Sequence, residues 1–258
     1  MQTLWIVGIL LPMLLSIIIP AFDEEKKLSL DMQAAATFLS RNQITGEVII
    51  VDDGSSDRTA ALAQEASLSP GIPRIVIQNR PHRGKGHAIR TGILASHGEY
   101  VMFADSGLTI PFEHILKGLR LLQQGACDLA LGSRKLPGSI IRREQDWDRK
   151  IISHLFHNLM VRWMHVPSHL TDTQCGFKIY RGELARTLYA ECITEGFMFD
   201  IEIILRAGNH GYRIMEFPVE WTCDRDSRIS VRRSTHQILK EILLIRRVLF
   251  KSKSRDPT

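Results

Sequence analysis

The chain has 258 residues, of which 44% are apolar and 24% are charged. This length and composition fit one large α/β domain with a buried core, and the lack of low-complexity tracts and fixed-period repeats excludes a repeat architecture. The formal net charge of +5 is too small to indicate a nucleic-acid partner by itself. The four cysteines include no C-x-x-C pair, which argues against a zinc site, and we expect a reducing compartment, while two disulfide bonds stay open.

The N-terminus is an apolar segment, residues 1–14, that precedes the first predicted strand. Residues 1–22 carry no charge and contain Pro12 and Pro20. The β-branched run at 16–19 favours a buried strand, and the apolar stretch left before it is too short to span a bilayer as a helix. No positive residues precede that stretch, as they would in a signal peptide. We therefore expect a membrane-dipping or packed segment, ahead of a true span and of a cleaved signal.

Strands and helices alternate through the first half of the chain. Apolar runs predict strands at 15–20, 47–51, 74–78, 100–104 and 128–132, and amphipathic stretches predict helices at 30–40, 57–66, 86–96 and 112–124. This order predicts an α/β fold with a mainly parallel central sheet and helices on both faces. In such sheets, ligands bind at the carboxyl ends of the strands.

Polar residues follow four of these strands. They are Asp23 and Glu24, Asp52 and Asp53, Asp105, and Ser133 and Arg134. A D-G-S turn explains the glycine after the second strand, but it does not explain two adjacent carboxylates, one of which can accept hydrogen bonds from a base or a ribose. Four strand ends with charged or polar side chains indicate a binding site rather than a core.

The segment R-G-K-G-H-A at 83–88 opens a predicted helix. Glycines before a helix expose backbone N–H groups, and together with Lys85 they favour phosphate binding. The spacing matches neither a Walker loop nor a Rossmann fingerprint, so a plain glycine-lined turn stays open as the alternative.

Asp105 ends the fourth predicted strand, where a pair of carboxylates two residues apart would hold a divalent cation against a diphosphate. Gly107 stands where the second acid would be expected. Farther along, D-T-Q-C-G-F-K at 172–178 gathers polar groups around one glycine, and Asp200 opens an apolar helix, either as a cap or as a site carboxylate. No neighbouring group activates Cys175, so we do not expect a nucleophile there.

The second half of the chain contains two predicted helices that are both apolar and basic. An apolar stripe at 149–165 runs beside Arg149 and Arg162, and a second stripe at 235–251 runs beside Lys240 and Arg247. Each helix alone fits packing against the core. Two such helices in one chain favour contact with an anionic membrane surface.

Seven short segments, taken in order, resemble the family 2 inverting glycosyltransferases, which have the GT-A fold. They are S-I-I-I-P-A-F-D-E-E, E-V-I-I-V-D-D-G-S-S-D-R-T, R-G-K-G-H-A-I-R-T-G-I, A-D-S-G, L-G-S-R, D-T-Q-C-G-F-K and F-M-F-D-I-E, within about Leu15 to Trp221. The third and sixth segments resemble the dolichyl-phosphate β-glucosyltransferase subgroup and its polyprenyl-phosphate relatives. The predicted organisation is an apolar segment at 1–14, a GT-A domain at 15–230, and a basic amphipathic helix and tail at 231–258.

The resemblance implies a role for each matching residue. A nucleotide-sugar pocket would be lined by Pro20, Ala21, Asp23 (where the family commonly has Asn), Glu24, Asp53, Lys85 and Asp105. The catalytic centre would contain Asp105, Arg134, Asp172, Gln174 and Asp200, with Lys178 on the sugar side. The acceptor phosphate would be bound by Arg134, Arg149 and Ser153. Asp105 would hold a magnesium or manganese ion.

The implied reaction moves a sugar, most simply glucose from UDP-glucose, onto a polyprenyl or dolichyl phosphate to give a β-linked lipid-phosphate sugar. Three alternatives stay open: a GDP-mannose-dependent mannosyltransferase, a family 2 transferase with a saccharide acceptor and Asp200 or Asp172 as its base, and a nucleotide-sugar-binding protein without turnover, as Gly107 would allow. We expect the protein at the cytoplasmic face of a membrane, peripheral or shallowly inserted, with no nucleic-acid partner.

Overall fold

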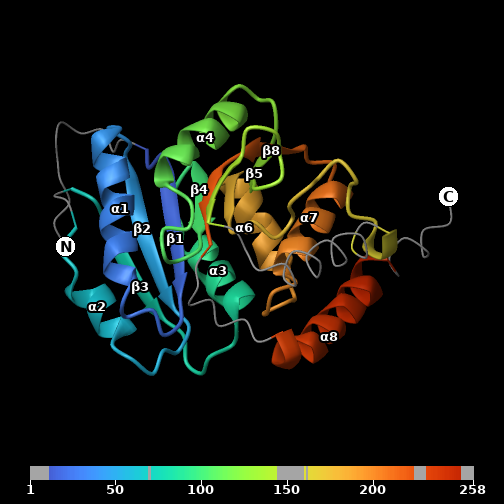
Figure 1. Cartoon of the computed structure of the whole chain (residues 1–258), viewed down its shortest axis with the longest axis horizontal. Helices are drawn as coiled ribbons and strands as arrows, with labels where there is room; N and C mark the ends of the chain where they lie inside the picture. Colours follow the sequence, from blue (N-terminus) through green and yellow to red (C-terminus); the bar gives the residue numbers. More distant parts are fainter. Residues whose placement is uncertain (1–11, 69–70, 144–159, 161, 224–230, 251–258) are drawn as a thin grey trace.

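The computed structural model describes residues 12–68, 71–143, 160, 162–223 and 231–250. Seven strands form a central sheet in the order β3-β2-β1-β4-β7-β5-β8 (Figure 1). They are β1 (Leu15–Ala21), β2 (Gly46–Asp52), β3 (Arg74–Gln78), β4 (Tyr100–Ala104), β5 (Leu129–Ser133), β7 (Phe177–Arg181) and β8 (Ile214–Pro218). Strand β7 is antiparallel to both of its neighbours and every other pairing is parallel, which confirms the predicted mainly parallel sheet.

Helices cover both faces of this sheet, as predicted (Figure 1). One face carries α1 (Leu28–Arg41), α2 (Thr59–Glu65), the 3-10 turn η1 (Phe112–His114) and α4 (Ile115–Gln123). The other face carries α3 (Lys85–Leu94), α6 (Gly182–Glu191), α7 (Phe199–Asn209) and α8 (Val231–Leu249).

Successive residues of β1 reach opposite cores. Ile17 and Ile19 pack with α1, whereas Ile18 packs with α3. A strand that is buried on both faces needs apolar residues at every position, which is why β1 reads in the sequence as one continuous apolar run. The interpretation of this run as a first strand is confirmed.

A second, two-stranded sheet pairs β6 (Ile140–Arg143) with β9 (Glu220–Thr222) in parallel. These strands follow β5 and β8 in the chain, so they extend the structure beyond the carboxyl ends of those strands. Strand β9 carries Trp221 toward the loop after β5, where the ring lies under Arg134.

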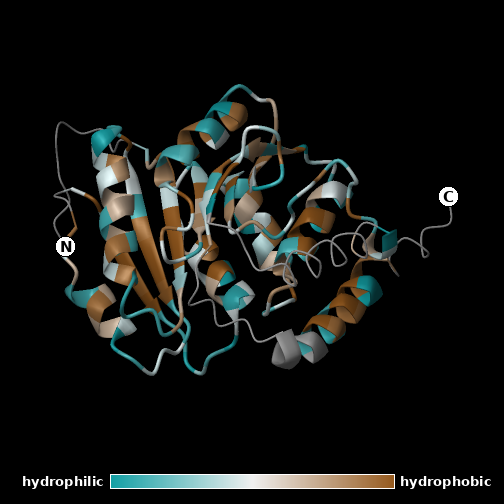
Figure 2. Ribbon diagram, viewed as in Figure 1, coloured by the Kyte–Doolittle hydropathy of each residue, from teal (hydrophilic) through white to brown (hydrophobic). Residues whose placement is uncertain are grey.

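The C-terminal helix α8 is amphipathic, with polar and apolar residues alternating around it in Figure 2. Its buried face contributes Ile242, Ile245 and Leu249 to the core that α7 shares. Within the part of the chain that the structure describes, no helix is long and apolar enough to cross a membrane. Most of the helix predicted at 149–165, and residues 1–11 of the apolar segment, lie outside the described residues.

Candidate functional site

The strand carboxyl ends that the sequence singled out meet along one side of the sheet and form two groups of loops. We call residues 20–24, 52–57 and 82–84 the β1–β2 edge, and residues 85, 105–108, 133–134, 171–178 and 200 the β4–β5 edge. The loops after β1, β2, β4 and β5 meet because parallel strands end at the same side of a sheet. Residues 171–176 join them because they lead into β7, which is antiparallel and starts at that side.

The loops after β1 and β2 are joined by hydrogen bonds. The Asp23 amide donates to Ser55 Oγ at 2.8 Å, and the Ser56 amide donates to Asp23 Oδ1 at 2.7 Å. The Glu24 amide donates to Thr59 Oγ1 at 2.7 Å. The predicted residues Asp23 and Glu24 therefore lie together, and they hold these two loops in a fixed relation.

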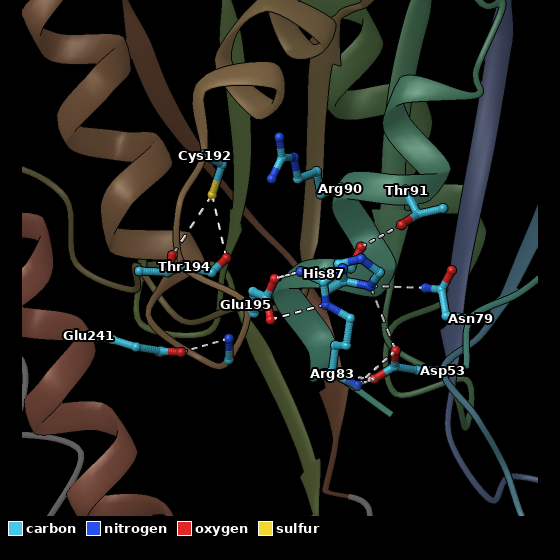
Figure 3. Close-up of polar contacts among 12 residues, drawn as sticks. Asp53, Asn79, Arg83, His87, Arg90, Thr91, Cys192, Thr194, Glu195 and Glu241 are labelled. Atoms are coloured by element: carbon cyan, nitrogen blue, oxygen red, sulfur yellow. Dashed lines mark hydrogen bonds and ion pairs between the residues drawn. The ribbon is translucent and has the colours of Figure 1, made fainter. Parts of the chain in front are cut away.

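Asp53 connects the β2 loop to the segment before α3. Its buried carboxylate accepts the Gly84 amide at 2.7 Å. It also accepts the Arg83 amide at 3.3 Å (Figure 3). The His82 Nδ1 atom lies 2.8 Å from Asp53 Oδ2, and the His82 ring stacks on Phe22 with centroids 4.0 Å apart. This half-exposed aromatic pair beside Asp53 was not foreseen from the sequence. The base-binding role of Asp53 stays a prediction.

The start of α3 differs from expectation. The Gly84 amide is bound by the Asp53 carboxylate, and the amides of Gly86 and His87 donate to the backbone carbonyls of residues 196 and 195, at 3.1 and 3.0 Å. The prediction that this turn exposes its N–H groups to a phosphate is therefore wrong for these three amides. The acceptors come from a loop far along the chain, which local sequence cannot reveal. The cation that remains is the Lys85 side chain.

Lys85 and Asp105 form an ion pair in which Lys85 Nζ lies 2.5 Å from Asp105 Oδ1, and the two side chains are 24% and 35% exposed. Burial on its own lowers the pKa of Lys85, but the negative charges of Asp105 and Asp200 outweigh it, so the pKa lies above its ordinary value. Lys85 is thus a fixed positive charge. A side chain at Gly176 would overlap the Asp105 carboxylate, which explains the glycine in D-T-Q-C-G-F-K.

A second lysine–aspartate pair lies deeper in the structure. Lys178 pairs with Asp200, and Lys178 Nζ also donates to the Cys175 carbonyl at 2.9 Å. Both charged side chains are buried. Burial raises the pKa of Asp200, and the lysines beside it oppose that change without cancelling it. Burial likewise raises the pKa of the Cys175 thiol to about 12, which leaves it protonated and unreactive.

Arg134 is clamped by Asp172 through two parallel hydrogen bonds, of 2.6 Å from Nε and 2.7 Å from Nη2. Asp172 is only 2% exposed, and its amide donates to Glu216, which also accepts the Thr171 amide. Burial raises the pKa of Asp172, but the guanidinium outweighs burial and the pKa falls below its ordinary value. The Arg134 Cζ atom lies 5.2 Å from the centre of the Trp221 ring. Both Asp172 oxygens accept hydrogen bonds from Arg134, so this carboxylate is not free to act as a base.

The loop after Asp105 is held by a residue that the sequence reasoning missed. Asp31 of α1 accepts the Gly107 amide at 2.9 Å and the Leu108 amide at 2.8 Å. Within the described residues there is no group of three or more histidine, cysteine or acidic residues that could hold a metal ion. Asp105 Oδ1 is paired with Lys85, and the predicted role of Asp105 as a ligand of a divalent cation stays a prediction. A single carboxylate is compatible with Mg²⁺, which keeps several waters and takes further oxygens from substrate phosphates.

Of the remaining predicted site residues, the structure describes three and leaves two outside the described residues. Pro20 and Ala21 end β1 beside Val51 and Asp52. Gln174 lies in the 171–178 loop, and its Nε2 is buried without an acceptor in the described part of the chain. Arg149 and Ser153 lie outside the described residues. The individual roles assigned to site residues stay predictions.

Comparison with known proteins places this geometry in context. The family model described as glycosyl transferase family 2 matches residues 16–188. The human dolichyl-phosphate beta-glucosyltransferase is 34% identical over 243 residues, which cover 90% of this chain and 74% of that protein. The Drosophila melanogaster dolichyl-phosphate beta-glucosyltransferase is 31% identical over 242 residues, with coverage of 90% and 74%.

Solved structures support the fold. The Mycobacterium tuberculosis glucosyl-3-phosphoglycerate synthase, solved with Mn²⁺ and UDP-glucose, has a TM-score of 0.67 at 17% identity over 90% of this chain and 78% of that one. The same synthase solved with Mg²⁺ and UDP has a TM-score of 0.64 at 16% identity, with coverage of 90% and 79%. At these identities the likeness concerns the fold alone.

Proposed function

The chain belongs to glycosyl transferase family 2, and from that premise we propose that it transfers glucose from UDP-glucose to a dolichyl or polyprenyl phosphate. The observation that carries this proposal is the pair of cations at the β4–β5 edge. Lys85 and Arg134 are each held by a carboxylate, and both lie within electrostatic reach of Asp105. Two fixed positive charges suit a reaction in which one phosphate attacks and another leaves.

The proposed reaction is an in-line displacement at the anomeric carbon. An oxygen of the lipid phosphate attacks the anomeric carbon and forms the new C–O bond. The bond from that carbon to the UDP oxygen breaks, and its electron pair leaves with UDP. Attack from the opposite face inverts an α-linked donor to a β-linked product. Lys85 would stabilise the departing diphosphate, and Arg134, with its planar guanidinium, would position a phosphate.

The state of the two candidate bases favours a phosphate acceptor over a saccharide. A sugar hydroxyl needs a base to remove its proton, whereas a phosphate is already ionised near neutral pH. Asp172 and Asp200 are both buried and paired, with Arg134 and with Lys178. Their carboxylates serve to hold cations, so an acceptor that arrives ionised is the better match.

A divalent cation is part of the proposal. When bound, it would supply positive charge to the leaving diphosphate. Asp105 would hold it, with the diphosphate and waters completing its coordination, because Gly107 offers no second carboxylate. Transfer should therefore require Mg²⁺ or Mn²⁺, and full activity in excess chelator would contradict this.

Helix α8 supports a location at a membrane surface. Seven of its described side chains are exposed: Gln237, Leu239, Lys240, Leu243, Leu244, Arg247 and Val248. Four of these, the three leucines and the valine, are large and apolar. Both charged members are basic, and none is acidic. An exposed face that mixes leucines with basic residues suits the boundary of an anionic bilayer, and we place it at the cytoplasmic face, where anionic lipids are enriched.

The decisive experiment incubates the protein with labelled UDP-glucose, Mg²⁺ and either dolichyl or undecaprenyl phosphate. We expect a labelled glucolipid that phosphatase does not cleave and from which mild acid releases labelled glucose. Parallel reactions with GDP-mannose and with a saccharide acceptor test the two alternative transferases. Tight binding of UDP without any product would instead indicate a nucleotide-sugar-binding protein.

A further inference from the structure

The loop between α6 and α7, residues 192–198, lies against the start of α3. The Glu195 carbonyl accepts the His87 amide at 3.0 Å, and the Gly196 carbonyl accepts the Gly86 amide at 3.1 Å. The Glu195 side chain also pairs with the exposed Arg83 (Figure 3). The first turn of α3 is therefore completed by carbonyls of this loop rather than by solvent.

The other side of the same loop is held by α8. The Glu241 carboxylate accepts the Gly196 amide at 2.7 Å and the Met198 amide at 3.1 Å. Gln237 Nε2, one helical turn earlier, donates to Glu241 Oε1 at 3.3 Å. Glu241 is only 8% exposed, and buried backbone amides need an acceptor of this kind.

Glycines allow these three segments to approach so closely. A Cβ atom at Gly84 would lie 2.6 Å from the Glu195 carbonyl oxygen, and one at Gly86 would lie 2.8 Å from the Gly196 carbonyl oxygen. On the α8 side, a Cβ atom at Gly196 would lie 2.5 Å from Glu241 Oε1. The loop is thus in direct contact with α3 on one side and with α8 on the other.

Lys85 lies between the two glycines whose backbone this loop contacts, and its ammonium group faces Asp105. We propose that Glu241 is a positioning residue for donor binding, which holds the 192–198 loop against α3 and so fixes Lys85 beside Asp105. This inference rests on the proposed function, because it takes Lys85 as a ligand of the donor diphosphate.

The position of Glu241 on α8 gives the contact a second consequence. At 100° per residue, Glu241 lies about 160° around the helix from both Leu239 and Leu243. The face that carries Glu241 contacts the 192–198 loop, and the opposite face carries the exposed Leu239 and Leu243. One helix therefore connects the surface proposed to meet the membrane with the segment proposed to bind the donor.

The test compares Glu241→Ala and Glu241→Gln with the wild-type protein. UDP binding is measured by calorimetry, and KM and kcat are measured with UDP-glucose and polyprenyl phosphate. Glu241→Ala should weaken UDP binding and raise the donor KM about tenfold, since two charge-assisted hydrogen bonds are lost. Glu241→Gln should recover part of this loss because its side-chain carbonyl still accepts one amide. The acceptor KM should stay within about twofold of the wild-type value.

A second variant reaches the same contact from the loop. Gly196→Ala pushes Glu241 and Gln237 aside, so it should raise the donor KM on its own and add little to Glu241→Ala. Gly208→Ala is the matched control, because a Cβ atom there meets nothing within 4 Å, and Glu113→Gln is the control for an exposed acid.

Three results would overturn the inference. The first is wild-type UDP affinity in folded Glu241→Ala and Gly196→Ala proteins. The second is an equal rise of the donor and acceptor KM values in both variants, which indicates a general loss of structure. The third is a wild-type protein that binds no UDP at all. That result also overturns the proposed function, whereas the first two results leave UDP binding by the wild-type protein intact. UDP binding by the wild type therefore distinguishes failure of the inference from failure of the proposed function.

Discussion

Asp31 and Asp172 are two aspartates that are each 2% exposed, yet their pKa values move in opposite directions. Burial raises the pKa of Asp31 to about 6, because its partners are neutral backbone amides. Burial also acts on Asp172, but the Arg134 guanidinium outweighs it and lowers the pKa. At equal depth, the charge of the partner decides the protonation state of a buried acid.

The same contrast separates the two regions of the site. At the β1–β2 edge, Asp53 accepts backbone amides and sets the shape of a loop. At the β4–β5 edge, Asp105 and Asp172 face side-chain cations and set the position of positive charge. Chemistry on phosphates depends on that charge, so we expect changes at the second region to affect turnover most.

The largest effect is expected for Arg134→Ala. The substitution removes a phosphate ligand and leaves Asp172 charged, buried and without its cation. We expect kcat/KM to fall about 1000-fold. The free energy of unfolding should fall by about 3–5 kcal/mol. Steady-state kinetics and urea denaturation measure the two effects separately.

Arg142→Ala is the matched control for this arginine. Arg142 also makes a two-point contact with a carboxylate, Glu220, but its side chain is 61% exposed and lies outside the two edges. Exposed pairs contribute about 0–1 kcal/mol. If both arginine variants lose the same activity or stability, burial of the partner is not what makes Arg134 matter.

Lys85→Ala should have the next largest effect. It removes the cation that faces Asp105, so we expect kcat to fall about 100-fold with UDP-glucose. Stability should change by less than about 1 kcal/mol, because both partners are partly exposed to water. Single-turnover assays with saturating donor measure the chemical step directly. A variant with normal turnover and weak donor binding would mean that Lys85 binds the ground state only.

The sequence predicted the first five strands well because the pattern that identifies them is local. Continuous apolar runs such as residues 15–20 identify strands buried on both faces. Acidic residues directly after them predict the ligand side of the sheet. The seven ordered segments also predicted the family, which the match to residues 16–188 confirms.

What the sequence could not predict depends on contacts between distant residues. The α3 amides looked available because their acceptors lie at 195–196, and Asp31 gave no local sign that it holds the loop after Asp105. Strand β7 was not predicted because its residues overlap the D-T-Q-C-G-F-K segment, which reads as a loop. Its Lys178 points to a buried acid that follows much later in the chain.

Asp31→Asn tests how a buried carboxylate bound to backbone amides affects stability at different pH values. The native carboxyl group keeps its proton up to about pH 6, whereas the unfolded chain loses it near 3.8, so the native state binds more protons in between. Stability from this group is complete below pH 3.8 and is lost as the pH rises through 6, by up to about 3 kcal/mol.

The asparagine variant has no such proton to lose. We therefore expect the difference in unfolding free energy between variant and wild type to shift in favour of the variant between pH 4 and pH 7. Urea denaturation at closely spaced pH values measures this. A difference that does not change with pH would show that Asp31 is ionised throughout, and that its amide partners compensate for burial as well as a cation does.

The smallest effect is expected at the exposed face of α8. Its described exposed side chains include no carboxylate, whether bound to backbone amides or paired with a cation. Leu239→Ser combined with Leu243→Ser removes two leucines that are 51% and 53% exposed. Because both are already partly in water, stability should change little, while partitioning onto anionic vesicles should fall about threefold to tenfold.

Leu30→Ser is the control, since Leu30 is 59% exposed on α1, at the other end of the molecule in Figure 1. Flotation of all three proteins with vesicles at low and high salt separates the apolar contribution from that of Lys240 and Arg247. Equal losses for the α1 and α8 variants would mean that α8 has no special affinity for the bilayer.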